Sequence, residues 1–446
     1  QGMTGSMLLH RQSDRYTSST QIVGWDSDFD QAVQDILNQV TISLREDAED
    51  ILCTYPLHPK VQGFFDDFVG KFGHSSILEL TGSPAVYVEG VSWFTSYLLF
   101  DSPLCAGQEF STRAVQHKNW PMARECGGNT ELAALHQDWF EVFEAEVKWW
   151  TDFFSHSENR AQFGVADKEP FRPALDRARW ALPGTISTGS SHTTSLRERA
   201  RVLDLGAKLN DSGDDADRSV WADIRSAYRQ ALPGLADLGL REAVYKPSTE
   251  LPHHLQHILF PLECDEDLAV QVQVTQTCPL PGGIGARKAE RTYADPAFNQ
   301  THHVQFSIPC SIAVLRDWHR HRTAFPCQVN VVTSNGGIRI DPHYTPMSDL
   351  AKEKLPMLLA RSNQAYTRFL QEGRVNKAAM ALPLGTQVVL EAGGGLRDFL
   401  YMGELRFFAH GANFEYKDQA NQLLEQLRGA VGIDVYDKLW HDSATP

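Results

Sequence analysis

The chain has 446 residues, of which 42% are hydrophobic and 22% are charged, and its formal net charge at pH 7 is −15. This composition is typical of a globular protein, and the length allows two domains or one large one. The acidic balance argues against a general binder of nucleic acid or of anionic membranes, because neither partner is attracted by an acidic surface. A ligand that carries phosphate would therefore need a local basic pocket.

The seven cysteines favour a reducing compartment, because they are scattered, odd in number and contain no C-x-x-C pair. No run reaches the roughly 18 apolar residues that a bilayer-spanning helix needs, and no signal peptide is evident. Gln1-Gly2 before Met3 is typical of a protease-cleavage scar, so residues 1–14 are assigned to a tag scar and a flexible N-terminus. We therefore expect a cytoplasmic protein with no membrane partner.

In chain order, helical periodicity predicts helices over 29–51, 135–154 and 355–370. Strands are predicted over 86–92 and 304–311, and each is followed by a helix. The stretch 207–252 is interpreted as a linker because of its polar and proline-containing loops. The second helix carries aromatic side chains that are expected to line a helix–helix core, with base stacking as the minor alternative: Trp139, Phe140, Phe143, Trp149, Trp150, Phe153 and Phe154.

The most informative segment is Arg320-His321-Arg322, which ends the helix after the second of these strands. Two guanidiniums and an imidazole repel one another unless an anion supplies counter-charge, and the arginine fork matches phosphate oxygens in a bidentate manner. The alternative is a solvated helix end, where positive charge interacts favourably with the helix dipole. This segment alone does not decide between the two.

An internal repeat is the second clue. Ala181-Leu182-Pro183-Gly184-Thr185 recurs as Ala381-Leu382-Pro383-Leu384-Gly385-Thr386, and each copy follows a helical turn that contains Arg or Lys. The order strand, helix, loop, helix, Leu-Pro, helix is the same in both parts of the chain. This predicts a duplicated module over 15–245 (the first half) and 246–446 (the second half).

The first half contains four short motifs in order. Gly73-His74-Ser75-Ser76-Ile77-Leu78-Glu79 has the pattern G-H-x-S-x-x-E, and 88–92 forms the next strand. Glu109-x-Ser111-x-Arg113 has the pattern E-x-S-x-R. Residues 176–183 are similar to E-x-A-R-x-x-L-P, and 221–225 are loosely similar to W-E-I-R.

The second half contributes Arg320-His321-Arg322, Arg397 and Arg406. In this order, the motifs resemble those of the flavin-dependent thymidylate synthases, with their R-H-R-x-x-S-x-x-E-x-S-x-R-Y signature. Arg397 falls at the family's asparagine-x-arginine, and Arg406 at its later catalytic arginine. The resemblance covers most of the chain, twice over.

The departures from the family pattern are complementary. The first half has Asp101-Ser102-Pro103 where R-H-R belongs, whereas the second half has Gln328, Asn330 and Val332 where E-x-S-x-R belongs. The second half also has Ala379 at the position where the first half has Arg179. Because the family builds its sites between subunits of a homotetramer, each fused copy could drop the groups that its neighbour supplies.

The resemblance implies an α+β fold of two tandem modules, each mostly helical with a small antiparallel sheet, that form an intrachain pseudo-dimer. Two chains would make a homodimer with four modules, and one kind of site would survive where unlike halves meet. The first half keeps Arg179, which is interpreted as structural.

Roles for individual residues follow from the resemblance. Arg320, His321 and Arg322 are expected to bind the diphosphate of FAD and approach its ring system. His74 and Ser76 are expected near the isoalloxazine or ribityl chain, and Arg397 is the weakest member of the cofactor set. Glu109 is expected to orient ligand hydroxyls, while Ser111 and Arg113 would bind the substrate phosphate. Arg406 is the predicted catalytic residue, because a guanidinium can stabilise negative charge that develops on a pyrimidine ring.

The implied activity is reductive one-carbon transfer to C5 of dUMP, giving dTMP, with FAD as cofactor and with NADPH and methylenetetrahydrofolate as co-substrates. Two alternatives stay open, namely a related flavoenzyme that acts on another nucleotide or small metabolite, and a non-catalytic scaffold that keeps the fold. No nucleic-acid partner is expected. No metal is expected either, since His253-His254-x-x-His257 and His302-His303 lack a second ligand pair.

Overall fold

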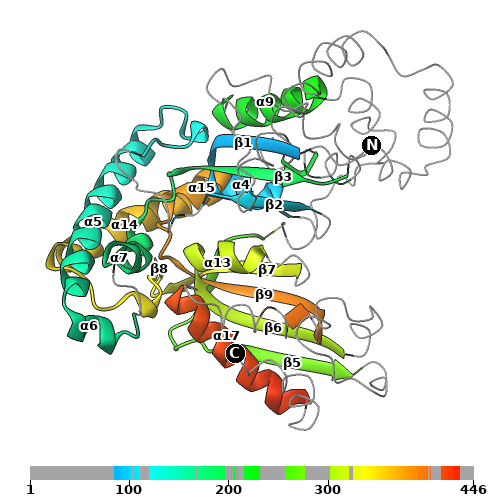
Figure 1. The fold of residues 1–446 in the computed structure, drawn as a ribbon. Coiled ribbons are helices and arrows are strands. Elements are labelled where there is room, and N and C mark those ends of the chain that lie inside the picture. The colour runs from blue at the N-terminus through cyan, green and yellow to red at the C-terminus, as the bar shows by residue number, and fades with distance from the viewer. Residues whose placement is uncertain are drawn as a thin grey trace, which may run out of the picture.

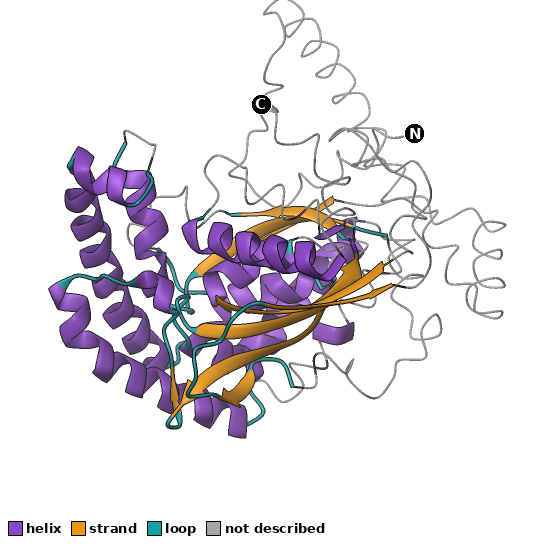
Figure 2. Ribbon diagram, turned by 90° about the horizontal axis from the view of Figure 1, so that it is seen from below, coloured by secondary structure: helices purple, strands orange, loops and turns teal. Residues whose placement is uncertain are grey.

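The computed structural model describes residues 85–101, 105–110, 120–165, 169–195, 215–231, 257–276, 302–320, 325–396 and 413–431, with a few single residues between these ranges. Two sheets lie on one side of the molecule, and the longest helices lie on the other (Figure 1). The same division is visible from below, where the strands are gathered beside a bundle of helices (Figure 2).

The smaller sheet belongs to the first half and is antiparallel throughout. Its order is β1 (Ala85–Ser92), β3 (Ser187–Thr193), β2 (Ala106–Glu109). The larger sheet belongs to the second half, with the order β4 (Phe260–Glu263), β7 (Phe325–Ser334), β9 (Gln387–Gly395), β6 (His302–Ser311), β5 (Gln271–Gln276). β8 (Gly337–Ile338) pairs with β7. Only the β4–β7 pair is parallel among the described strands.

The helices follow the same order in both halves. α4 (Trp93–Leu99) follows β1, and α13 (Ile312–His319) follows β6. α7 (Phe171–Ala178) precedes β3, and α15 (Val375–Ala381) precedes β9. α9 (Asp215–Ala231) and α17 (Phe414–Val431) come after those strands. The remaining described helices are α5 (Thr130–Ser155), α6 (Ser157–Gln162), α14 (Asp349–Gln371) and the 3-10 turns η3 (Arg124–Cys126), η4 (Arg179–Ala181) and η6 (Pro342–Tyr344).

The expected mixture of helices with small antiparallel sheets is confirmed, apart from the parallel β4–β7 pair. The predicted strands at 86–92 and 304–311 correspond to β1 and β6. The linker prediction for 207–252 is wrong in its middle, because α9 buries Val220, Trp221 and Ile224 there. The helix predicted over 29–51 lies outside the described residues.

A serine starts the helix after each of the two matching strands. Ser92 Oγ accepts a hydrogen bond from Thr95 N at 3.1 Å, and Ser311 Oγ accepts one from Val314 N at 3.2 Å. Both serines have extended backbone, as N-cap residues do. Each cap fixes the turn from its strand into its helix. In the second half, this turn directs the basic end of α13 toward the first half.

The long helices α5 and α14 join the two halves. They pack through Trp139, whose Nε1 donates to Ser362 Oγ at 2.9 Å. Ion pairs flank this contact along the helices: Lys354 with Glu141, Arg361 with Asp138, and Arg368 with Glu131. The prediction of an aromatic helix–helix core is confirmed by the buried members of the set: Trp139, Phe140, Phe143, Trp150 and Phe154.

The two Leu-Pro turns of the repeat contact each other. Leu384 N donates to Leu182 O at 2.9 Å, and Gly385 N donates to Trp180 O at 2.7 Å. A Cβ on Gly184 would lie 2.1 Å from Leu382 O. Such a close backbone approach requires glycine, so the turns form a tightly packed junction between the halves.

Two amide–carboxylate hydrogen bonds between the halves lie beside this junction, one buried and one partly buried. Asn413 Nδ2 donates to Asp176 Oδ1 at 2.9 Å, while Asn376 Nδ2 donates to Asp217 Oδ1 at 3.1 Å. In both cases the carboxylate belongs to the first half and the amide to the second. In both contacts, therefore, the second half donates and the first half accepts.

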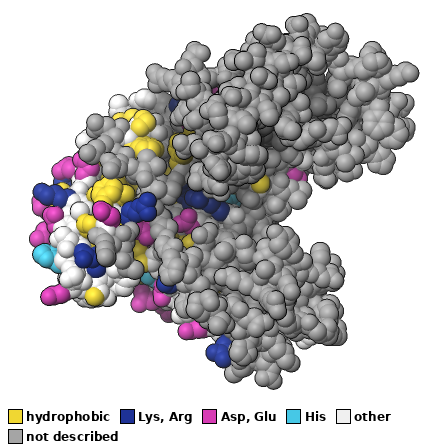
Figure 3. Space-filling view, viewed as in Figure 1, with side chains coloured by type: hydrophobic (Ala, Val, Ile, Leu, Met, Phe, Trp, Pro, Cys, Tyr) yellow, Lys and Arg dark blue, Asp and Glu magenta, His cyan; other side chains and the backbone are white. Residues whose placement is uncertain are grey.

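The described surface over α5 and α6 carries acidic and basic side chains interspersed (Figure 3). Within the described ranges, no helix is long and apolar enough to cross a membrane.

Candidate functional site

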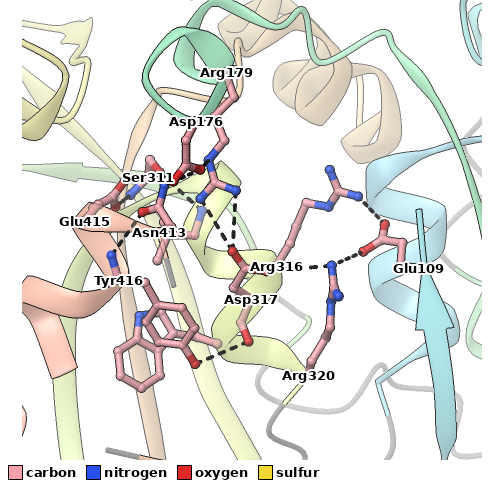
Figure 4. Close-up of polar contacts among 12 residues, drawn as sticks. Glu109, Asp176, Arg179, Ser311, Arg316, Asp317, Arg320, Asn413, Glu415 and Tyr416 are labelled. Carbon is pink, nitrogen blue, oxygen red and sulfur yellow. Dashed lines mark hydrogen bonds and ion pairs between the residues drawn. The ribbon is translucent and has the colours of Figure 1, made fainter. Parts of the chain in front are cut away.

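Of the predicted site residues, the structure describes Glu109 and Arg320. Glu109 ends β2 of the first half, and Arg320 is the C-cap of α13 in the second half. Arg320 Nη2 lies 3.7 Å from Glu109 Oε2 (Figure 4). The other predicted members lie outside the described residues: His74, Ser76, Ser111, Arg113, His321, Arg322, Arg397 and Arg406.

The structure adds Arg316, which the motifs did not single out. Its Nη2 lies 2.5 Å from Glu109 Oε1, and the side chains of both residues are only 5% exposed. Arg316 and Arg320 are four residues apart, so one face of α13 presents both guanidiniums to β2. That spacing is visible in the sequence, whereas the distant carboxylate that it meets is not.

The charged contacts continue behind Arg320. Its Nη2 lies 3.7 Å from Asp317 Oδ1, and Asp317 Oδ2 lies 3.5 Å from both terminal nitrogens of Arg179. Arg179 Nε is 3.9 Å from Asp176 Oδ1. We call this series the ionic string. Carboxylates and guanidiniums alternate along it, and both halves contribute members: Asp176, Arg179, Asp317, Arg320, Glu109 and Arg316 (Figure 4).

The ionic string leaves donors unused. Nε of Arg316 and Nε of Arg320 are buried and make no hydrogen bond to the part of the chain that the structure describes. Burying a guanidinium is costly unless its donors are satisfied, so the unpaired Nε of Arg320 suits an anionic ligand at this position. The side chain of Arg320 is 28% exposed, which leaves it accessible to such a ligand.

A buried ionisable cluster lies where α13 begins. Glu415 accepts from Ser311 N and from Ser311 Oγ, each at 2.7 Å, and Ser311 Oγ lies 3.2 Å from Tyr344 Oη. Burial and the nearby Asp341 raise the pKa of Glu415 above its usual value. Burial lowers the pKa of His343, but its hydrogen bond to Asp341 more than offsets this effect and the pKa rises to about 9.

A second cluster lies where α4 begins. Ser92 N donates to Glu125 Oε1 at 2.9 Å, and Ser92 Oγ donates to Asn376 Oδ1 at 2.9 Å. Asn376 in turn donates to Asp217. Burial and the charge of Glu125 raise the pKa of Asp217 to about 7, and burial also raises the pKa of Glu125. The contact between the halves therefore contains carboxyls whose pKa values are raised by burial.

These shifts predict that the protein loses stability as the pH rises from about 4 to about 9. The pKa of His343 is raised from 6.5 to about 9 on folding, so its stabilisation is full below pH 6.5 and is lost as pH rises through 9. The pKa of Asp217 is raised from 3.8 to about 7, so its contribution is full below pH 3.8 and is lost as pH rises through 7. Urea unfolding across this range should show the free energy of unfolding falling, by at most about 1.4 kcal/mol per pH unit for each proton.

Two variants separate the pH ranges over which His343 and Asp217 act. His343→Gln should flatten the upper part of the profile, and Asp217→Asn the lower part. A profile that keeps its slope in both variants would contradict these assignments.

No described group of three or more His, Cys, Asp or Glu side chains could hold a metal ion. The described cysteines are free thiols: Cys105, Cys126, Cys264 and Cys310.

Residues 297–431 match a family model, described as thymidylate synthase complementing protein. The predicted resemblance is thereby confirmed for this segment, which contains Arg316, Asp317 and Arg320. Glu109 and Arg179 lie outside it. No curated protein matches the chain.

Proposed function

We propose that the chain is an FAD-binding enzyme of the flavin-dependent thymidylate synthase type, with its site where the first half meets the second. The observation that carries this proposal is the contact of Glu109 with Arg316 and Arg320. Two segments that resemble parts of one family signature lie more than 200 residues apart in the sequence, yet they meet in space. The family match over 297–431 supports flavin-dependent chemistry in general.

We also propose that the halves are a duplicated module that forms a pseudo-dimer. The repeated order of elements supports this, as do the turns that meet at Leu182 and Leu384. Further support comes from equivalent turn contacts, because Ser187 N donates to Pro121 O at 3.0 Å and Gln387 N donates to Arg339 O at 2.8 Å. Two such chains would form a homodimer.

Among the described residues, the positions equivalent to the ionic string in the other half do not form a second set of this kind. When Ser92 is matched with Ser311, Arg316 corresponds to Tyr97 and Arg320 to Asp101. Glu109 corresponds to Val329, since Glu109 pairs with Ser190 of β3 and Val329 pairs with Leu390, the matching position of β9. The guanidinium–carboxylate set is thus made once, which supports one kind of site per chain.

The residues present fit an anionic cofactor, because Arg320 lies partly exposed at the junction and its Nε makes no hydrogen bond among the described residues. Arg320, with His321 and Arg322, would bind the FAD diphosphate, and His74, Ser76 and Arg397 would complete the cofactor site. FAD would supply the redox chemistry. Ser111 and Arg113 would hold the substrate phosphate, and Glu109 would orient its hydroxyls.

The reaction that we propose is one-carbon transfer from methylenetetrahydrofolate to C5 of dUMP, with NADPH as reductant. Arg406 would stabilise negative charge on the pyrimidine as C5 becomes nucleophilic. A related flavoenzyme with another substrate is the second candidate. It is favoured by Ala114, which stands where the family signature ends in tyrosine.

A visible absorption spectrum tests flavin binding directly. The purified protein should be yellow or should become so with added FAD; a colourless protein that ignores FAD would favour the scaffold. Arg320→Ala should abolish flavin retention, whereas Arg113→Ala should keep flavin and weaken binding of dUMP. The reverse outcome would contradict this division of roles.

Tritium release from dUMP labelled at C5 tests the product. Release that depends on NADPH and methylenetetrahydrofolate would support thymidylate synthesis. Flavin that is reduced and reoxidised without release of label would favour the second candidate.

A further inference from the structure

We infer that Arg316 is a positioning residue, which holds Glu109 so that Arg320 stays available to an anionic ligand. This inference rests on the proposed function for the nature of the ligand, because the anion is taken to be the diphosphate of FAD. It concerns a residue that the family signature did not single out.

Exposure separates the roles of the two arginines. The side chain of Arg316 is 5% exposed and faces a carboxylate that is equally buried. The side chain of Arg320 is 28% exposed. A ligand that enters the junction can therefore reach Arg320, while Arg316 lies behind it against β2.

Distances show how the charge is shared. Arg316 Nη2 lies 2.5 Å from Glu109 Oε1, so this carboxylate already has a close cationic partner. Arg320 Nη2 lies 3.7 Å from Glu109 Oε2 and also 3.7 Å from Asp317 Oδ1. Both of these distances exceed that of a hydrogen bond. Arg320 is thus held between two carboxylates by charge, without its donors being consumed by either.

Removal of Arg316 would change this balance. Glu109 would remain buried, with Arg320 as its remaining guanidinium among the described residues. A buried carboxylate without a counter-charge is costly, so Glu109 should draw Arg320 into a close pair. The guanidinium would then turn toward β2 and away from the ligand. Thr188 offers only a 3.5 Å contact to Glu109 Oε1 and cannot replace the lost charge.

The test is a double-mutant cycle with FAD titrated into flavin-free full-length protein. Arg316→Met should weaken FAD binding by about tenfold or more, the loss expected when a hydrogen bond to a charged group is misplaced. In a Glu109→Gln background the same substitution should change affinity by less than about threefold, because no carboxylate remains to capture Arg320. Arg316→Lys keeps a positive charge beside Glu109 and should retain most of the affinity.

Arg339→Met is the control for loss of an arginine outside the ionic string, because the Arg339 side chain contacts Cys264 O and lies 3.7 Å from Asp267 Oδ1. It should leave FAD affinity unchanged. Thermal unfolding of each variant shows whether weaker FAD binding results from loss of the fold or from a change in the site. An equal loss in both Glu109 backgrounds would indicate direct ligand contact by Arg316 and would overturn the inference, as would wild-type affinity in Arg316→Met.

Failure of the proposed function gives a different result. If the wild-type protein ignores FAD, the same cycle is measured by calorimetry with inorganic pyrophosphate. Coupling between positions 316 and 109 in that titration would support the positioning role without the flavin. Absence of pyrophosphate binding to wild-type protein would overturn both proposals.

Discussion

Replacement of Gly184 by alanine is expected to destabilise the protein by about 3 kcal/mol or more, beyond the usual range for overpacking. The added Cβ would lie 2.1 Å from Leu382 O and 2.9 Å from both Ala379 O and Met380 O. All three neighbours are backbone atoms, so no flexible side chain can move aside. The two Leu-Pro turns would have to separate, with loss of the hydrogen bonds between them. Chemical denaturation of the purified variant measures the effect.

Gly429→Ala is the matched control. Gly429 lies in α17, and a Cβ there would meet nothing within 4 Å. Alanine should stabilise this helix by roughly 0.5–1 kcal/mol. A Gly184→Ala variant as stable as the wild type would mean that the turns do not approach so closely in solution.

Replacement of Arg179 by methionine is expected to cost about 3–5 kcal/mol, the range for breaking a buried ion pair from one side. Arg179 is 1% exposed and contacts Asp317 and Asp176. Burial lowers the pKa of its guanidinium, but Tyr344 and the two carboxylates outweigh this effect and raise it overall, so the group stays charged. Methionine fills similar space yet leaves both carboxylates without that charge.

Arg124→Met provides the comparison, because Arg124 and Asp223 form a 2.5 Å pair whose side chains are more than half exposed. Its loss should cost less than about 1 kcal/mol. Equal costs for the two substitutions, measured by urea unfolding, would argue against a structural role for Arg179 inside the ionic string.

Local structure was predictable where a pattern and a cap agree. β1 and β6 each end in a serine that starts a helix, and the Leu-Pro repeat marks equivalent turns. α9 was missed because the acidic loop before it is typical of a linker, although Val220, Trp221 and Ile224 have the spacing of a buried helix face.

The candidate site was predictable only in part. Arg320 was found because clustered cations call for an anion, and Glu109 because it lies in a motif. Their contact depends on how two distant segments pack, which local sequence does not encode. Buried acids such as Glu125 and Glu415 were missed for a related reason, since a carboxylate in a sequence resembles a surface charge until its partners are known.

The two amide–carboxylate hydrogen bonds affect which halves of the chain can associate with each other. Asp176 and Asp217 both come from the first half, while Asn413 and Asn376 both come from the second. If the first halves of two different polypeptides docked in the same way, aspartate would oppose aspartate at these contacts. Such mispairing would be penalised by like-charge repulsion, so a first half should pair with a second half rather than with another first half.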